Sequence, residues 1–111
     1  MNKEPRARKP RKASLPSRKE EFYVLRLYVA GLTPRSRTAI SNITGICEEH
    51  LQGRYDLEVI DVFQRPILAR EEQIIATPTL VKRLPAPLRR LIGDLSEKEK
   101  VLIGLDLRRL G

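Results

Sequence analysis

The chain has few of the residues from which catalytic and metal-binding sites are built. Its 111 residues include one cysteine, one histidine, no tryptophan, three tyrosines and two phenylalanines. A single cysteine excludes an intramolecular disulfide and a cysteine-rich zinc site. A single histidine argues against a histidine-based metal centre or a Ser–His pair. So few aromatic side chains would also make a thin stacking platform for nucleic-acid bases.

Long apolar runs and catalytic motifs are missing as well. No apolar stretch approaches the roughly 18 residues that a membrane-spanning helix needs, and the N-terminus lacks the apolar core of a secretory signal. The sequence contains no phosphate-binding loop, no dinucleotide-binding glycine motif and no nucleophile elbow. We therefore expect a cytoplasmic, single-domain protein with no membrane association, no catalytic residues, no metal and no cofactor. Its function should be a binding surface.

Positive charge is concentrated at the start of the chain. Residues 1–20 hold eight Lys/Arg and two Glu, a net charge of +6, whereas residues 21–111 hold 14 Lys/Arg and 12 Asp/Glu, a net charge of +2. Residues 1–20 also have three prolines and almost no large aliphatic side chains, which predicts a disordered basic N-terminal extension. We expect residues 21–111 to form the folded domain. The extension would solubilise the chain, or bind nucleic acid or an acidic protein surface.

The first half of the folded part predicts a strand, a helix and a strand. Residues 22–30 are rich in β-branched and aromatic side chains and predict a central strand. Thr33 is expected to cap a helix over residues 34–51, with Pro34 at its first position. Residues 55–63 predict a second strand, buried on both faces. A strand–helix–strand unit of this length predicts that the two strands are parallel.

The order of elements is that of a thioredoxin-like domain, but the redox chemistry is missing. Redox members have a Cys-x-x-Cys where the first helix begins, and this chain has Leu32-Thr-Pro-Arg-Ser36 there. Cys47 lies three turns further on, on the apolar stripe of the helix, where a buried and inert thiol is expected. His50, at the end of the helix, is expected at the surface or facing the helix dipole rather than as a ligand.

The middle of the chain predicts a short helix and a third strand. Residues 66–73 are typical of a helix, with Glu72 facing water. Residues 74–81 predict a strand that is interrupted by Pro78, and a proline in such a run marks an edge, a bulge or a cis peptide.

The last thirty residues carry conflicting local signals. Residues 84–93 suit a helix, or a strand over 88–92 after a proline-rich bend. Ser96 and Glu99 form a capping-box pattern that predicts a helix. Residues 101–107 are apolar with β-branched side chains and suit a strand equally well. Such conflict is either a failure of single-sequence reasoning or a real bistability between two packings.

Several ordered blocks between residues 22 and 107 resemble the KaiB circadian-clock family. The blocks are Tyr23-Val-Leu-Arg-Leu-Tyr-Val-Ala-Gly31, Thr33-Pro34, Leu57-Glu-Val-Ile-Asp-Val62, Ala76-Thr-Pro-Thr-Leu80, Ile92-Gly-Asp-Leu-Ser96 and Glu99-Lys-Val-Leu-Ile-Gly-Leu-Asp-Leu107. The resemblance implies a metamorphic α/β protein with a thioredoxin-like N-terminal βαβ half. Its C-terminal half would switch between a ground-state fold, βαββααβ, and a thioredoxin-like fold, βαβαββα.

The resemblance also implies a regulatory function and its partners. KaiB-like proteins rest as a homo-oligomer, a dimer or tetramer, and in the switched form bind the ring ATPase KaiC and promote its dephosphorylation phase. KaiA is captured too where the host has one. The basic extension departs from the family pattern and identifies a divergent or non-cyanobacterial member. The alternative is a KaiB-like adaptor outside a clock, whose basic extension binds nucleic acid or an acidic protein surface.

Candidate site residues follow from the same resemblance. The positions expected to bind the partner are Thr33, Pro34, Lys82, Arg89 and Arg90. The positions expected to govern the switch are Pro78, Pro85, Pro87, Gly104 and Asp106. Isomerisation of X-Pro bonds takes tens to hundreds of seconds and would slow such a switch. A glycine weakens a helix by about 1 kcal/mol relative to alanine, and an aspartate late in a helix opposes its dipole, so Gly104 and Asp106 are expected to hold back the helical form.

Overall fold

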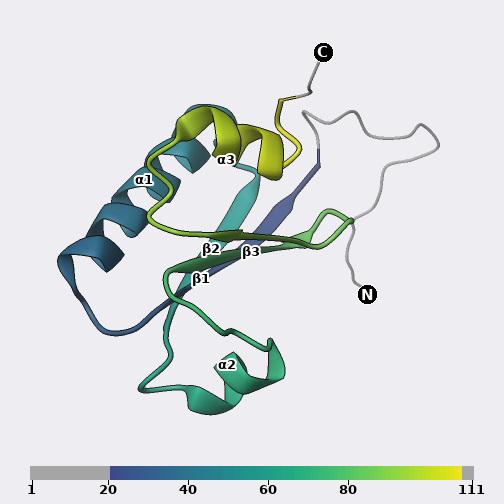
Figure 1. Ribbon diagram of the computed structural model, residues 1–111. Coiled ribbons are helices and arrows are strands. Elements are labelled where there is room, and N and C mark those ends of the chain that lie inside the picture. Colours follow the sequence, from purple (N-terminus) through teal and green to yellow (C-terminus); the bar gives the residue numbers. More distant parts are fainter. Residues whose placement is uncertain (1–20, 109–111) are drawn as a thin grey trace.

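The computed structural model describes residues 21–108, so the prediction of a disordered extension over residues 1–20 lies outside the described residues. The described chain has the order βαβαββα (Figure 1), which is the thioredoxin-like alternative. Its elements are β1 (Tyr23–Val29), α1 (Pro34–His50), β2 (Tyr55–Asp61), α2 (Pro66–Glu71), β3 (Thr79–Leu84), β4 (Arg89–Ile92) and α3 (Lys98–Gly104).

The four strands form one mixed sheet in the order β2-β1-β3-β4. β1 and β2 are parallel, as the strand–helix–strand pattern predicted, while β3 runs antiparallel to β1 and β4 antiparallel to β3. Helices α1 and α3 cover one face of the sheet and α2 lies on the other (Figure 1). None of the helices in residues 21–108 is long and apolar enough to span a bilayer.

The central position predicted for the first strand is confirmed. Leu25 and Leu27 of β1 are fully buried under α1 and α3, whereas Tyr28 is fully buried on the opposite face, under α2. Each of the two leucines contributes about 1.5–3 kcal/mol by leaving water. Because β1 is buried on both faces, it packs against the helices on both sides of the sheet, and the other elements are arranged around it.

The predicted start of α1 is also confirmed. The Thr33 hydroxyl oxygen accepts a hydrogen bond from the Ser36 backbone N–H at 3.1 Å, and Pro34 occupies the first turn. This cap satisfies one of the N–H groups that a helix start leaves without an intrahelical partner. The buried stripe of α1 includes Ala39, Ile43 and Cys47, at the 3.6-residue spacing of an amphipathic helix.

Two burial predictions are wrong. β2 lies at the edge of the sheet rather than inside it, and Val59 and Phe63 are 40% and 74% exposed. Helix α2 is too short to cover the whole face, and in β2 only Ile60 is buried. Glu72, predicted to face water, has a side chain only 10% exposed because Arg83 and Arg90 lie against it.

The conflicting C-terminal signals resolve in favour of two strands and a helix. β3 begins at Thr79, directly after a cis Thr77–Pro78 peptide, so the strand predicted over residues 74–81 starts later and runs further. Residues 89–92 are a strand, and residues 98–104 are a helix.

The predicted capping box is wrong. Glu97 is the N-cap of α3, without a side-chain cap. The Ser96 N–H instead donates to the Asp94 carboxylate at 3.0 Å. The hydroxyl and N–H donors of Ser96 hold the pKa of Asp94 below its usual range.

Candidate protein-binding site

The strand directions place the predicted site residues at two opposite ends of the sheet. The ends of β1, β2 and β4 and the start of β3 share one end, which we call the carboxyl end. Thr33, Pro34 and Pro78 lie there. Lys82 and Arg89 face each other across β3 and β4 at the other end. The structure therefore does not gather the five predicted partner-binding residues into one site.

Lys82 is buried, which differs from its predicted role in meeting a partner. Its side chain is 0% exposed, and its Nζ lies 2.6 Å from Asp106 Oδ2 and 5.8 Å from the centre of the Tyr23 ring. Arg89 reaches the same carboxylate, with Nη2 3.3 Å from Asp106 Oδ1. In this fold Lys82 is a core cation held by an anion and an aromatic face, and cannot contact an outside surface. Arg89 is half-exposed and shared between Asp106 and solvent.

Asp106 lies just past the end of α3 and joins that end to the β3–β4 hairpin. Its burial raises the pKa of its carboxyl group, but the hydrogen bonds from Lys82 and Arg89 outweigh burial, and the net pKa lies below its ordinary value. Beside it, the Tyr23 hydroxyl donates to the Leu105 carbonyl at 3.0 Å. These contacts stabilise the helical form. They oppose the destabilisation that was expected from an aspartate at the negative end of the helix dipole, because that expectation did not include them. A cost remains, because Asp106 has a φ of 62°.

Gly104 allows α3 to approach β4 closely. A Cβ at this position would lie 2.5 Å from Leu91 Cδ2 and 3.2 Å from Leu91 Cγ. An alanine would therefore gain helix propensity but force the Leu91 side chain to move. The glycine thus has a packing role in this fold besides its predicted effect on the switch.

Pro85 and Pro87 lie in the connection between β3 and β4, which holds two further cis peptides. Arg90, on β4, faces α2 rather than the Asp106 cluster. Its Nη2 lies 3.5 Å from Glu72 Oε2, and its Nη1 donates to the Gln73 carbonyl at 3.3 Å. Arg90 therefore ties the end of α2 to the sheet and retains about a third of its side-chain surface.

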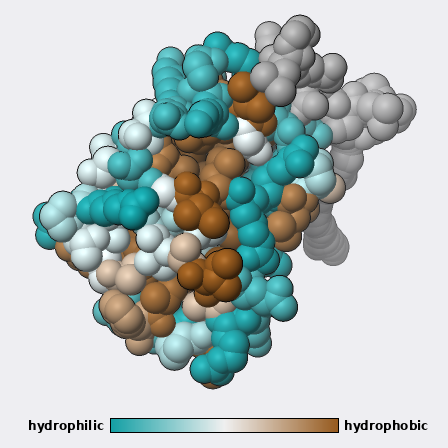
Figure 2. Space-filling view, in the orientation of Figure 1, coloured by the Kyte–Doolittle hydropathy of each residue, from teal (hydrophilic) through white to brown (hydrophobic). Residues whose placement is uncertain are grey.

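The carboxyl end of the sheet carries exposed apolar side chains that sequence reasoning missed. One follows β1, one follows β2, one follows α2 and one ends β4. They are Leu32 at 67%, Phe63 at 74%, Ile75 at 91% and Ile92 at 64% exposed. Figure 2 shows hydrophobic clusters among hydrophilic residues on one face of the molecule. Phe63 was assigned to a strand buried on both faces, and Ile75 to a strand interrupted by Pro78, so neither was expected at a binding surface.

The one cysteine has no access to redox chemistry in this fold. Cys47 is fully buried, and burial together with the Glu48 charge raises the pKa of its thiol to about 12. A thiol with that pKa is protonated at neutral pH and is a poor nucleophile. His50 lies in the last turn of α1 with a partly exposed side chain, at the negative end of the helix dipole. Within residues 21–108 no three His, Cys, Asp or Glu side chains gather as a metal site would require.

Comparison with known families decides what this fold represents. Residues 26–107 match the family model described as the KaiB domain. The chain belongs to the KaiB family. The circadian clock oscillator protein KaiB of Microcystis aeruginosa is 61% identical over 88 residues, covering 79% of this chain and 85% of that protein. The KaiB of Synechococcus elongatus is 60% identical over 85 residues, covering 77% of this chain and 83% of that protein. The family is one of clock regulatory, non-catalytic proteins.

Solved structures confirm the thioredoxin-like fold of this KaiB-family chain. The N-terminal domain of Synechococcus elongatus SasA matches with a TM-score of 0.65 and 23% identity, covering 90% of this chain and 98% of that one. Mitochondrial thioredoxin 3 of Saccharomyces cerevisiae matches with a TM-score of 0.64 and 18% identity, covering 81% of this chain and 82% of that one. At these identities the likeness concerns the fold alone.

Proposed function

We propose that this KaiB-family chain binds a KaiC-type ring ATPase in its thioredoxin-like form and promotes the dephosphorylation phase of that ATPase. Free in solution it rests as a dimer or tetramer, and it captures KaiA where the host has one. Pro78, Pro85, Pro87, Gly104 and Asp106 lie in or beside the half that changes fold.

The observation that carries the proposal is the exposed apolar surface at the carboxyl end of the sheet, in a chain about 60% identical to clock oscillator proteins. Exposed apolar side chains rimmed by charge are typical of protein-binding surfaces. Thr33 and Pro34 lie at this end and are part of the proposed contact. Arg90 is proposed to act indirectly, by holding α2 in place on the sheet. Arg89 is proposed to contact the partner with the exposed half of its side chain. Lys82 is no longer proposed to touch the partner.

The test is complex formation with a KaiC-type ATPase. The chain is incubated for many hours with the ATPase and ATP, and its molar mass is followed by size-exclusion chromatography with light scattering. The phosphorylation state of the ATPase is measured in parallel. We expect free dimers or tetramers to disappear into a ring-bound complex and phosphorylation to fall.

A pair of matched variants locates the surface. Ile75→Ser removes an apolar side chain at the carboxyl end, whereas Leu84→Ser removes one that is 53% exposed at the opposite end. Ile75→Ser should weaken binding about ten-fold or more, as truncation of a central interface residue does, and Leu84→Ser should have little effect. A chain that never joins the ring would contradict the proposal and leave the adaptor alternative. Equal effects of the two variants would contradict the location.

A further inference from the structure

The second edge of the sheet offers free backbone groups. β4 is the edge strand beside β3. The Gly93 N–H donates to the Pro78 carbonyl at 2.9 Å and sets the alternation of this antiparallel ladder. Residues that bond to the neighbouring strand alternate with residues that do not along an antiparallel pair. Ile92 and Arg90 lie one and three residues before Gly93, so their N–H and C=O groups point away from β3. Within residues 21–108 no hydrogen bond outside the strand ladder uses these groups.

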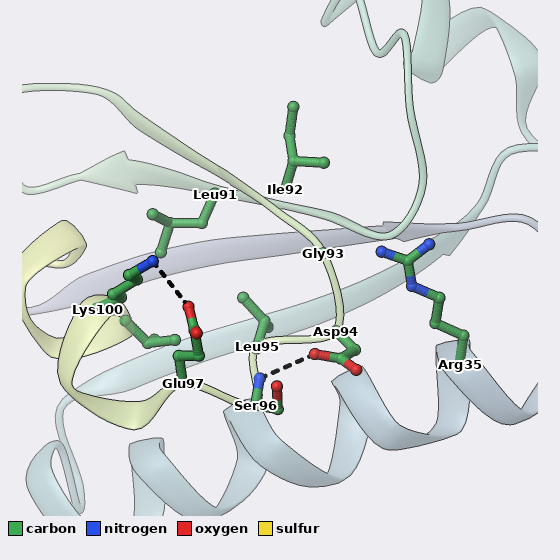
Figure 3. A pocket seen from close by; sticks show the side chains of 10 residues that line it. Arg35, Leu91, Ile92, Gly93, Asp94, Leu95, Ser96, Glu97 and Lys100 are labelled. Carbon is green, nitrogen blue, oxygen red and sulfur yellow. Dashed lines mark hydrogen bonds and ion pairs between the residues drawn. The ribbon is translucent and has the colours of Figure 1, made fainter.

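A pocket of about 350 Å³ lies beside this edge, between β4, the start of α1 and the start of α3 (Figure 3). Leu91, Leu95 and Val101 give it apolar walls, and charged side chains form its rim. Ile92 points to the other side of the strand from Leu91, as the alternation of a strand requires (Figure 3). The volume lies in the range of about 300–1,000 Å³ that ligand pockets occupy.

Among residues 21–108, Arg35 is the rim cation that makes no direct ion pair. Lys100 is paired with Glu97 at 3.0 Å, and Asp94 accepts from Ser96. Arg35 extends from α1 toward Gly93 (Figure 3), and its Nη2 lies 3.9 Å from where a Cβ of that residue would be. Among residues 21–108 no carboxylate lies within ion-pair distance of Arg35. After the hydrogen bonds from Ser96, the Arg35 charge also contributes to the lowered pKa of Asp94, but the two side chains form no direct ion pair. The exposed guanidinium can therefore pair directly with a carboxylate from outside.

We propose that the β4 edge and this pocket bind an extended acidic peptide segment. The segment adds a fifth strand along β4, places one apolar side chain in the pocket and brings a carboxylate to Arg35. Backbone pairing supplies affinity in this mode, and the pocket selects the side chain. A second copy of β4 fits poorly, because two antiparallel copies would set Arg89 and Arg90 against their own like charges. The inference goes beyond binding of the ring ATPase and does not depend on it.

The probes are two fluorescein-labelled peptides, Thr-Val-Leu-Val-Asp-Thr and the order-reversed Thr-Asp-Val-Leu-Val-Thr. In each, leucine and aspartate lie on the same face, and the pair covers both strand directions. Fluorescence anisotropy with the purified full chain measures affinity, and amide chemical shifts locate the site. We expect one of the two to bind, with the largest shifts at Arg90, Ile92 and Arg35.

Matched variants separate this mode from unspecific attraction to a basic chain. Arg35→Ala should lower the affinity about ten-fold, the effect of losing a charge-assisted hydrogen bond. Arg37→Ala removes an equal charge two residues further along α1, outside the pocket, and should change affinity less than two-fold. Replacing aspartate by asparagine in the peptide should weaken binding to the unaltered chain but not to the Arg35→Ala variant.

A change in the peptide tests backbone pairing without any risk to the protein fold. N-methylation removes one amide donor at a time, and only alternate residues of an added strand donate to β4. Affinity should therefore fall at every second position. Failure of both peptides to bind at millimolar concentration would overturn the proposal. Equal losses at all N-methyl positions, or shifts centred on β2, would overturn it as well.

Discussion

The two halves of the molecule differ in what holds their helices. α1 has seventeen residues, a side-chain cap from Thr33 and five buried residues, whereas α3 has seven residues, no side-chain cap and two buried residues. A helix of seven residues is not stable alone in water. The N-terminal half is therefore specified locally by its own sequence. The C-terminal half depends on contacts between distant segments.

Those distant contacts gather at the end of α3. The Tyr23 hydroxyl reaches the Leu105 carbonyl across 82 positions, and Lys82 reaches Asp106 across 24. Strained backbone lies on both sides of the same helix, since Leu95 and Asp106 have φ values of 64° and 62°. Each such residue costs about 1–3 kcal/mol. A helix fixed by a few tertiary contacts and flanked by strain is one that a modest change can release.

The largest expected effect comes from breaking the Lys82–Asp106 pair. Asp106→Asn leaves a buried ammonium without its carboxylate and should lower the free energy of unfolding of the thioredoxin-like form by about 3 kcal/mol. Lys82→Met in the same chain removes the orphaned charge and should recover part of that loss. Urea unfolding followed by circular dichroism measures both.

An exposed ion pair is the control for that cycle. Glu99→Gln breaks the pair between Glu99 and Arg108, both of which are largely exposed, and should cost less than about 1 kcal/mol. If the double variant Lys82→Met, Asp106→Asn is less stable than Asp106→Asn alone, the ion pair is not what holds this end of α3.

The same pair predicts how stability depends on pH. Because the pKa of Asp106 is lower in the folded chain than its ordinary value, its contribution is present above about pH 4. The contribution is lost as pH falls through the folded pKa. Thermal unfolding from pH 6 to pH 2 should show the unaltered chain and Asp106→Asn converging at the acid end. A constant difference between the two would contradict the assignment.

Removal of the α1 cap is a smaller change that tests the other half. Thr33→Ala leaves the Ser36 N–H without its acceptor and should cost about 1 kcal/mol. Thr38→Ala, at an exposed position inside α1, should cost little. Amide exchange should report the loss in the first turn of α1 and leave α3 unchanged. Loss of protection in α3 instead would mean that the two halves are not independently specified.

Close packing between α3 and β4 predicts that substitutions at Gly104 and Leu91 change the free energy of unfolding in a coupled way, by about 1 kcal/mol. Gly104→Ala places a methyl group against Leu91, and Leu91→Ala removes the side chain that it meets. The cost of Leu91→Ala should therefore be lower, by about 1 kcal/mol, when residue 104 is alanine. A double-mutant cycle on unfolding free energies measures this coupling. Additive effects would show that the contact does not limit residue 104.

Sequence reasoning succeeded where local signals agree. Thr33, Pro34 and the apolar stripe of α1 all predict one helix, and the parallel β1–β2 pairing follows from its length. It failed at β2, because apolar composition cannot tell an edge strand from an inner one. The expectation that Lys82 contacts a partner failed, because no residue near Lys82 in the sequence indicates that Asp106, 24 positions away, pairs with it. Residues 88–107 stayed ambiguous because α3 is fixed by Tyr23 and Lys82, which are far away in sequence.

The substitution with the smallest expected effect would give α3 a side-chain N-cap, as α1 already has. Glu97 occupies the N-cap of α3 with no side-chain hydrogen bond to the helix. Glu97→Asp shortens the side chain so that its carboxylate can accept from the first turn, which should stabilise the helical form by about 0.5 kcal/mol. Glu97→Gln is the control, because it also weakens the exposed pair with Lys100 but supplies no cap. Amide exchange in α3 should slow for the aspartate variant and not for the glutamine variant. Equal rates in both would mean that tertiary contacts alone, and not the missing cap, set the stability of this helix.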